Sequence, residues 1–203
     1  MKIKQLKNIT NKIRKYTPYE PPQPKNKMLP PTYNIVLSAS PKGGGKTYNC
    51  IQLLTNYEES GFVSEKGEDV RMRTIWVSGG TSRSKQNAIL NTLKTLHDDD
   101  RFDIEEGVDS KLKEIYEEIK LERDEIEIYN VYRKTYEKFM KSKTLSNLTL
   151  DELTLLEWKN FTDPKDDPDC PKDKDGNILY HPRMVFLILD DMIGSDGFSS
   201  MKR

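Results

Sequence analysis

The sequence predicts an α/β fold in which helices flank a parallel β-sheet. Apolar runs with strand character cover residues 33–39, 73–78 and 184–189. Segments with helical periodicity, 47–58 and 85–96, follow the first two of these runs. Strands that alternate with helices at this spacing are typical of βαβ units, in which successive strands run parallel.

The first strand leads directly into a glycine-rich loop and then into the first helix. The loop consists of Ser40, Pro41, Lys42, Gly43, Gly44, Gly45, Lys46 and Thr47. It matches the phosphate-binding motif, a glycine, four variable residues and Gly-Lys-Ser/Thr, except that Ser40 stands at the first glycine position. In this motif backbone N–H groups surround a polyphosphate, the lysine binds the β- and γ-phosphates, and the hydroxyl reaches Mg²⁺. The loop and Tyr48, which follows it, are therefore the predicted nucleotide site, with Lys46 on the phosphates and Thr47 on the metal.

The second strand, 73–78, is followed by Gly79 and Gly80 and then by a predicted helix. Thr81 or Ser82 is a suitable cap for a helix over 85–96. The apolar residues of this helix recur on one face, as expected for a helix that covers a sheet; they are Ile89, Leu90, Leu93 and Leu96.

A charged helical insertion is predicted over 108–161. Apolar residues form a helical stripe among dense Lys and Glu, which favours one or two long amphipathic helices, with a shorter one over 146–158. A coiled-coil seam or partner surface is an alternative, but a helix lying on its own domain is the simpler interpretation. The polar segment 162–182 follows, with a hairpin-type turn at Asp175-Gly176. A calcium loop there is excluded, because prolines fall on its first and twelfth ligand positions.

The last predicted strand, 184–189, is the most apolar run of the chain and ends in Asp190-Asp191. In a phosphate-loop protein this pattern is typical of the Walker B strand, which places a carboxylate near Mg²⁺ at the carboxyl edge of the sheet. We assign Asp190 to the metal and Asp191 to the general base that polarises the attacking water. Lys46 and Asp191 are thus the predicted catalytic residues.

The amino-terminal segment, 1–32, is predicted to lie outside the α/β domain of residues 33–203. Residues 1–28 contain eight Lys or Arg and one acid, and the spacing of the apolar residues in 1–16 favours a short basic amphipathic helix. Such a helix can contact DNA, a membrane surface or a partner, or it can pack on its own protein. Six prolines in 17–32 indicate an extended linker.

Composition excludes several classes of protein. The 203 residues include 33% charged side chains with a formal net charge of zero, which gives no overall attraction to nucleic acid. Two cysteines and two histidines make a zinc site improbable. No apolar run approaches the ~18 residues of a membrane span, and no apolar core of a secretory signal follows the basic start.

With both motifs placed, the chain resembles the genome-packaging ATPases of nucleocytoplasmic large DNA viruses, the poxvirus-type branch of the FtsK–HerA superfamily. The resemblance covers about residues 30–195 and rests on the phosphate-binding loop, on strand 74–78 and on the segment 186–193. It implies a P-loop ATPase that uses ATP and Mg²⁺ to drive double-stranded DNA into a capsid. It also implies a homo-oligomeric ring, contact with a capsid or portal protein, and a location in the host cytoplasm, at the viral factory, or in the virion.

One departure from the family concerns the carboxyl end. The chain stops twelve residues after Asp191, before the strand that carries a polar sensor residue in the family. An arginine finger is not assignable either, with Arg183 and Arg203 as candidates. We therefore expect an amino-terminal part of a split or truncated ATPase, with an incomplete sheet and a complementing fragment as partner.

Two other classes of function are compatible with the motifs. One is a different P-loop NTPase, either a cellular DNA translocase or a nucleotide kinase. A kinase needs arginines near the phosphates, and the insertion offers only Arg123 and Arg133, on a periodic Lys/Glu helix. The other is a non-catalytic nucleotide-binding assembly module, which would bind nucleotide without hydrolysing it.

Overall fold

The computed structural model describes residues 1–14, 20–32, 44–78, 88–103 and 108–190. The chain folds into two compact units. The helical unit comprises Met1–Tyr19 and Tyr116–Pro182, and the α/β unit comprises Glu20–Ile115 and Arg183–Arg203. Each unit is described by itself below. The predicted domain boundary between residues 32 and 33 stays a prediction.

A parallel three-stranded sheet forms the centre of the α/β unit. Its strands are β4 (Met72–Ser78), β5 (Arg101–Asp103) and β6 (Met184–Asp190), in the order β5-β4-β6. Strands β4 and β6 pair in parallel over their whole length, from Met72↔Met184 to Ser78↔Asp190. The predictions of strands at 73–78 and 184–189 and of a parallel sheet are confirmed, while the strand predicted at 33–39 lies outside the described residues.

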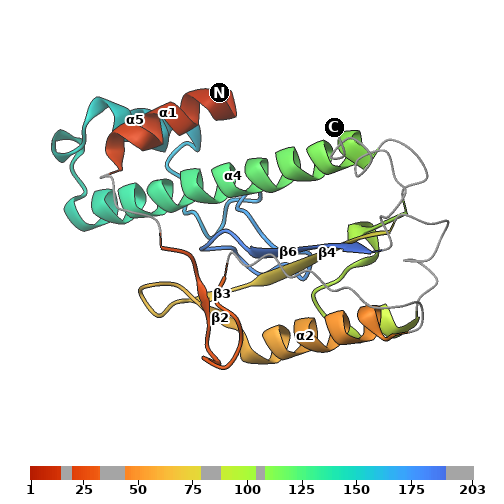
Figure 1. The fold of residues 1–203 in the computed structure, drawn as a ribbon. Helices are drawn as coiled ribbons and strands as arrows, with labels where there is room; N and C mark the ends of the chain where they lie inside the picture. Colours follow the sequence, from red (N-terminus) through yellow and green to blue (C-terminus); the bar gives the residue numbers. More distant parts are fainter. Residues whose placement is uncertain (15–19, 33–43, 79–87, 104–107, 191–203) are drawn as a thin grey trace. The chain divides into compact units, whose positions relative to one another are not determined.

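Helix α2 (Lys46–Ser60) covers one face of β4 and β6 (Figure 1). Its buried Ile51 and Leu54 pack with Trp76 of β4, and Ile188 of β6 packs against the same cluster. The helix ends at Gly61, whose φ of 66° is unfavourable for other residues and whose N–H bonds the Tyr57 carbonyl at 2.9 Å. The helix predicted at 47–58 is thus confirmed.

The helix predicted over 85–96 is wrong in its described part. Only η1 (Ala88–Thr92) is helical there, as a 3₁₀ turn, and turns follow it. The reason is Glu58 of α2, whose carboxylate accepts the N–H groups of Lys94 at 3.2 Å and Thr95 at 2.9 Å. The Thr95 carbonyl in turn accepts the Thr74 N–H at 3.0 Å. These backbone groups are therefore unavailable to an α-helix, although the predicted apolar face is still used: Leu90, Leu93 and Leu96 are buried.

A small antiparallel sheet uses part of the proline-rich segment. Strands β1 (Gln23–Pro24), β2 (Phe62–Val63) and β3 (Asp69–Val70) pair in the order β1-β2-β3. Pro24 is tolerated because β1 is an edge strand of this sheet, where a missing N–H need not break a ladder. Gln23 and Pro24 fall in the predicted extended linker, so this part of it belongs to the folded α/β unit.

The helical unit is built from α1 (Ile3–Ile13), most of α4 (Val108–Ser142), η3 (Leu145–Asn147) and α5 (Leu150–Trp158). Leu6 of α1 is buried with Tyr132 of α4 and Leu155 of α5 in one apolar core. Helix α5 begins with a capping box, in which Thr149 accepts the Glu152 N–H at 3.2 Å and donates its own N–H to the Glu152 carboxylate at 2.7 Å. The predicted helices at the amino terminus and in the insertion are confirmed, with one continuous α4. None of the described helices is both long and apolar enough to cross a membrane.

The turn predicted at Asp175-Gly176 is also present. An isolated antiparallel bridge joins Lys172 and Ile178 on its two sides. Gly176 has φ 81°, a left-handed conformation that favours glycine, and Asp173 accepts N–H groups of Asp175 and Asn177 through its carboxylate. The aspartates here thus stabilise a turn.

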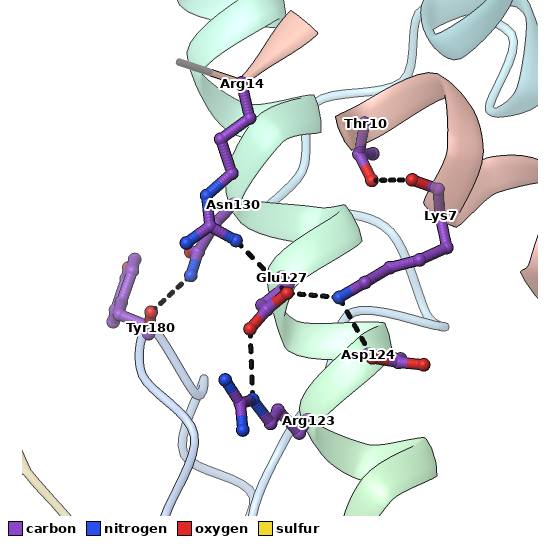
Figure 2. Close-up of polar contacts among 8 residues, drawn as sticks. All are labelled: Lys7, Thr10, Arg14, Arg123, Asp124, Glu127, Asn130 and Tyr180. Atoms are coloured by element: carbon purple, nitrogen blue, oxygen red, sulfur yellow. Dashed lines mark hydrogen bonds and ion pairs between the residues drawn. The ribbon is translucent and has the colours of Figure 1, made fainter. Parts of the chain in front are cut away.

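Basic side chains of α1 are paired with acids of α4 (Figure 2). Glu127 accepts from Lys7 and Arg14, and from Arg123 of its own helix at 3.1 Å. Lys7 also pairs with Asp124 at 2.9 Å. Of the alternatives open for the basic segment, these contacts favour a helix packed on its own protein.

Glu127 should make the stability of the helical unit dependent on pH. Burial alone raises the pKa of Glu127, but the hydrogen bonds and charges of Lys7 and Arg123 outweigh burial and lower it. Its stabilising contribution is therefore complete above the unfolded pKa of about 4.3 and is lost as the pH falls through the lower folded-state value. We expect Glu127→Gln to lower the free energy of unfolding of the helical unit by about 1 kcal/mol at pH 7 and by little near pH 3.

The measurement is urea denaturation at both pH values in a Trp76→Phe background, where Trp158 reports on the helical unit. Glu117→Gln is the matched control, because Glu117 forms only an exposed pair with Lys120, at 3.8 Å. Equal costs of Glu127→Gln at pH 7 and pH 3 would show that the ion pairs contribute nothing.

Candidate nucleotide-binding site

The described part of the predicted phosphate-binding loop opens α2. Gly44 and Gly45 are exposed, and Lys46 and Thr47 begin the helix and are half-buried. The Tyr48 ring is 54% exposed on the first turn. The other predicted loop residues, Ser40, Pro41, Lys42 and Gly43, lie outside the described residues, as does Asp191.

Gly45 determines how the loop enters the helix. It has φ 75° and ψ 18°, and its carbonyl accepts the Asn49 N–H at 2.9 Å, which closes the first turn. A Cβ at this position would meet nothing within 4 Å, so the need for glycine comes from the left-handed backbone alone. The next N–H groups belong to the first turn of α2, where helical N–H groups have no partner within the helix and the dipole favours anions.

The structure brings Asp190 to the same edge of the sheet as the start of α2. Strands β4 and β6 both point to the end of the sheet at which α2 begins (Figure 1). Burial raises the pKa of the Cys50 thiol, and the negative charge of Asp190 raises it further. Because β6 ends in Asp190, this residue lies at the end of the sheet where α2 begins, within electrostatic range of Cys50.

Arg183, one candidate for an arginine finger, directly precedes β6 and so lies at the other end of this strand from Asp190. Arg203, the other candidate, is outside the described residues. Arg123 and Arg133 belong to the helical unit, where Arg123 pairs with Glu127 and Arg133 donates to the Leu179 carbonyl at 3.2 Å. These contacts give both arginines of the insertion a packing role.

Ser78 lies at this edge of the sheet, and the sequence analysis assigned no role to it. Ser78 ends β4 directly opposite Asp190 and is 1% exposed, and its hydroxyl has no hydrogen-bond partner among the described residues. The available signal was a small polar residue at the end of the apolar run Ile75-Trp76-Val77, just before two glycines. A buried polar atom without a partner is unusual in a folded protein and often marks a functional position.

The donors at this edge suit Mg²⁺. The Thr47 hydroxyl and the Asp190 carboxylate are hard oxygen ligands, and the unpaired Ser78 hydroxyl lies next to Asp190 in the register of the sheet. Mg²⁺ in proteins is usually held by one or two such groups together with phosphates and water. Among the described residues, no group of three or more His, Cys, Asp or Glu side chains is arranged to hold a metal ion by itself.

The chain was compared with protein-family models, with curated proteins and with solved structures. None of the three comparisons finds a match. What this edge of the sheet does chemically therefore rests on its own residues, above all on Lys46, Thr47 and Asp190.

The helical unit contains a cavity of about 410 Å³, lined in part by Tyr129, Trp158 and Lys159. The Lys159 ammonium is paired with Asp167 at 2.9 Å and with Asp169 at 2.8 Å. Its charge is thus already neutralised by the protein. None of the residues predicted to bind nucleotide or metal lines this cavity.

Proposed function

We propose that this chain binds ATP and Mg²⁺ where α2 begins and where β4 and β6 end. The observation that supports the proposal is that β6, which ends in Asp190, runs to the end of the sheet at which α2 begins with Lys46-Thr47. In the proposal a cation, a hydroxyl and a carboxylate act together at a helix N-terminus, as they do in phosphate-loop proteins.

Each residue has a specific role in this proposal. Lys46 binds the β- and γ-phosphates, Thr47 and Asp190 hold the metal, and Asp191 accepts the proton of the attacking water. Mg²⁺ supplies neutralisation of the charge that develops on the phosphates. The remaining loop residues, from Ser40 to Gly45, contribute backbone N–H groups, and Tyr48 lies next to the nucleotide.

We further propose that the ATPase is the motor subunit of a viral DNA-packaging machine. The resemblance of the three motif segments to the poxvirus-type packaging ATPases favours this function. Two of these segments form β4 and β6, and the direct parallel pairing of these strands brings the two segments together. In this proposal double-stranded DNA is the polymer moved, other copies or a complementing ATPase fragment complete the ring, and a capsid or portal protein is the docking partner. The ion pairs of α1 within the helical unit mean that DNA contact is expected from other residues.

Lys46→Ala should lower the affinity for ATP–Mg²⁺ about 10- to 100-fold, because hydrogen bonds to charged groups contribute about 1.5–3 kcal/mol. Isothermal titration calorimetry of the full chain measures this, and Lys66→Ala, an exposed lysine in the turn between β2 and β3, is the matched control. Asp191→Asn should retain binding and lose hydrolysis, assayed with and without duplex DNA.

Equal ATP affinities of the wild type and Lys46→Ala would refute the nucleotide site. Binding by the wild type without hydrolysis, even with DNA and at high protein concentration, would instead leave a non-catalytic nucleotide-binding module. Hydrolysis that duplex DNA does not stimulate would argue against the motor.

A further inference from the structure

The Ser78 side chain is a buried polar group that the fold itself does not use. Its hydroxyl is buried at the end of β4 and has no hydrogen-bond partner in the described part of the chain, whereas the Thr74 hydroxyl on the same strand is bonded to the Thr95 hydroxyl at 2.7 Å. Nearly all buried hydroxyls in folded proteins have a partner, so one without a partner requires an explanation.

The register of the sheet determines what lies next to this hydroxyl. Side chains of paired residues on neighbouring strands point to the same face, and alternate residues of a strand share a face. Trp76 and its register partner Ile188 both pack against α2. Two residues further along each strand, Ser78 and Asp190 therefore lie on the α2 face as well, with the two backbones about 4.8 Å apart.

This placement brings Ser78 to the edge of the sheet that carries Asp190. β4 and β6 end, at Ser78 and Asp190, at the end of the sheet where α2 begins (Figure 1). Ser78 is thus buried next to the strand that carries Asp190, on the face of the sheet that α2 covers. A short side chain suits this position, because the residue is almost fully buried.

We propose that Ser78 is a positioning residue of the nucleotide site, whose hydroxyl donates a hydrogen bond to the Asp190 carboxylate when a divalent cation and ATP are bound. The bond holds the carboxylate in the orientation that faces the metal and its water shell. Groups that orient a metal ligand in this way commonly alter metal affinity by about 10- to 100-fold when they are removed. The inference rests on the proposed function, because it needs a nucleotide–metal complex at this edge.

The test compares four variants of the full chain: Ser78→Ala, Ser78→Thr, Ser78→Val and Lys46→Ala. Threonine and valine have nearly the same shape and differ by the hydroxyl, so their comparison isolates the hydrogen bond. Two affinities are measured, that of Mn²⁺ for the protein–ATP complex by electron paramagnetic resonance and that of ATP in EDTA by calorimetry. Urea denaturation of the ligand-free proteins provides a third, independent measurement.

The Mn²⁺ affinity should fall about 10-fold in Ser78→Ala and Ser78→Val, and Ser78→Thr should restore it. The stability of the ligand-free Ser78→Ala protein should not fall, because its hydroxyl has no partner to lose. A purely structural role predicts the reverse, a loss of stability with unchanged Mn²⁺ affinity.

Wild-type Mn²⁺ affinity in Ser78→Ala, or equal affinities in the threonine and valine variants, overturns the role of Ser78. If the wild type binds ATP and Lys46→Ala weakens that binding, the nucleotide site survives such a result. If the wild type binds no ATP, both proposals fail together.

Discussion

Replacing Asp100 by alanine is expected to lower the free energy of unfolding of the α/β unit by about 3–5 kcal/mol. Asp100 is fully buried and accepts hydrogen bonds from Arg73 of β4, at 3.2 Å from Nε and 2.6 Å from Nη2. Arg73 is itself only 4% exposed. Removal of the carboxylate leaves a buried guanidinium without its main counter-charge, which is far more costly than the loss of a surface pair.

The unfolding transition is measured by urea titration in a Trp158→Phe background, where Trp76, in the same strand as Arg73, is the only tryptophan. Asp98→Ala is the matched control, because Asp98 lies in the same short helix, η2 (Asp98–Asp100), and its side chain is 94% exposed. Arg73→Met combined with Asp100→Leu should recover much of the loss, since apolar replacement of a whole buried pair is often neutral. A single Asp100→Ala variant as stable as Asp98→Ala would contradict the account.

Asp167→Ala should destabilise the helical unit by about 2–4 kcal/mol. Its buried carboxylate accepts the Tyr129 hydroxyl at 2.7 Å, pairs with the Lys159 ammonium at 2.9 Å, and accepts the Asp169 N–H at 2.9 Å. Burial alone raises the pKa of Asp167, but these hydrogen bonds outweigh burial and lower it. Burial raises the pKa of the Tyr129 hydroxyl, and its hydrogen bond to Asp167 raises it further.

Lys159 retains Asp169 as a partner at 2.8 Å, and for this reason the expected cost is smaller than that of Asp100→Ala. Urea denaturation with Trp158 as the only tryptophan measures it, and the exposed neighbour Asp166 provides the control variant Asp166→Ala. A midpoint shift no larger than that of the control would mean that the network around Asp167 does not stabilise this unit.

Local sequence predicted the elements that depend on neighbouring residues. The apolar runs of β4 and β6 and the periodicity of α2 and α4 can each be recognised within one continuous stretch of sequence. The turn at Gly176 and the left-handed Gly45 belong to the same group, because the backbone conformation itself selects glycine. These features explain why both motifs and their order along the chain could be recognised.

Other features depend on partners far away in the sequence. Glu58 takes the N–H groups that a helix through Thr95 would need, and no pattern within 85–96 contains that information. The pairing of β1 with β2 and the ion pairs of Lys7 with α4 likewise join segments that are far apart in the sequence. Without knowledge of these partners, the sequence predicted 17–32 as an extended linker and left open whether the basic helix contacts DNA, a membrane surface or a partner, or packs on its own protein.

The sequence by itself determined that a phosphate-binding loop precedes a helix and that an apolar strand ends in Asp190, because each motif is a continuous stretch of chain. Only the tertiary structure decided that Asp190 lies at the end of the sheet where α2 begins and directly opposite Ser78. These positions of Asp190 depend on the parallel pairing of β4 with β6, whose paired residues are more than 100 positions apart. The burial of the Ser78 hydroxyl without a partner among the described residues is a property of that packing, and it identifies a residue to which the sequence motifs assigned no role.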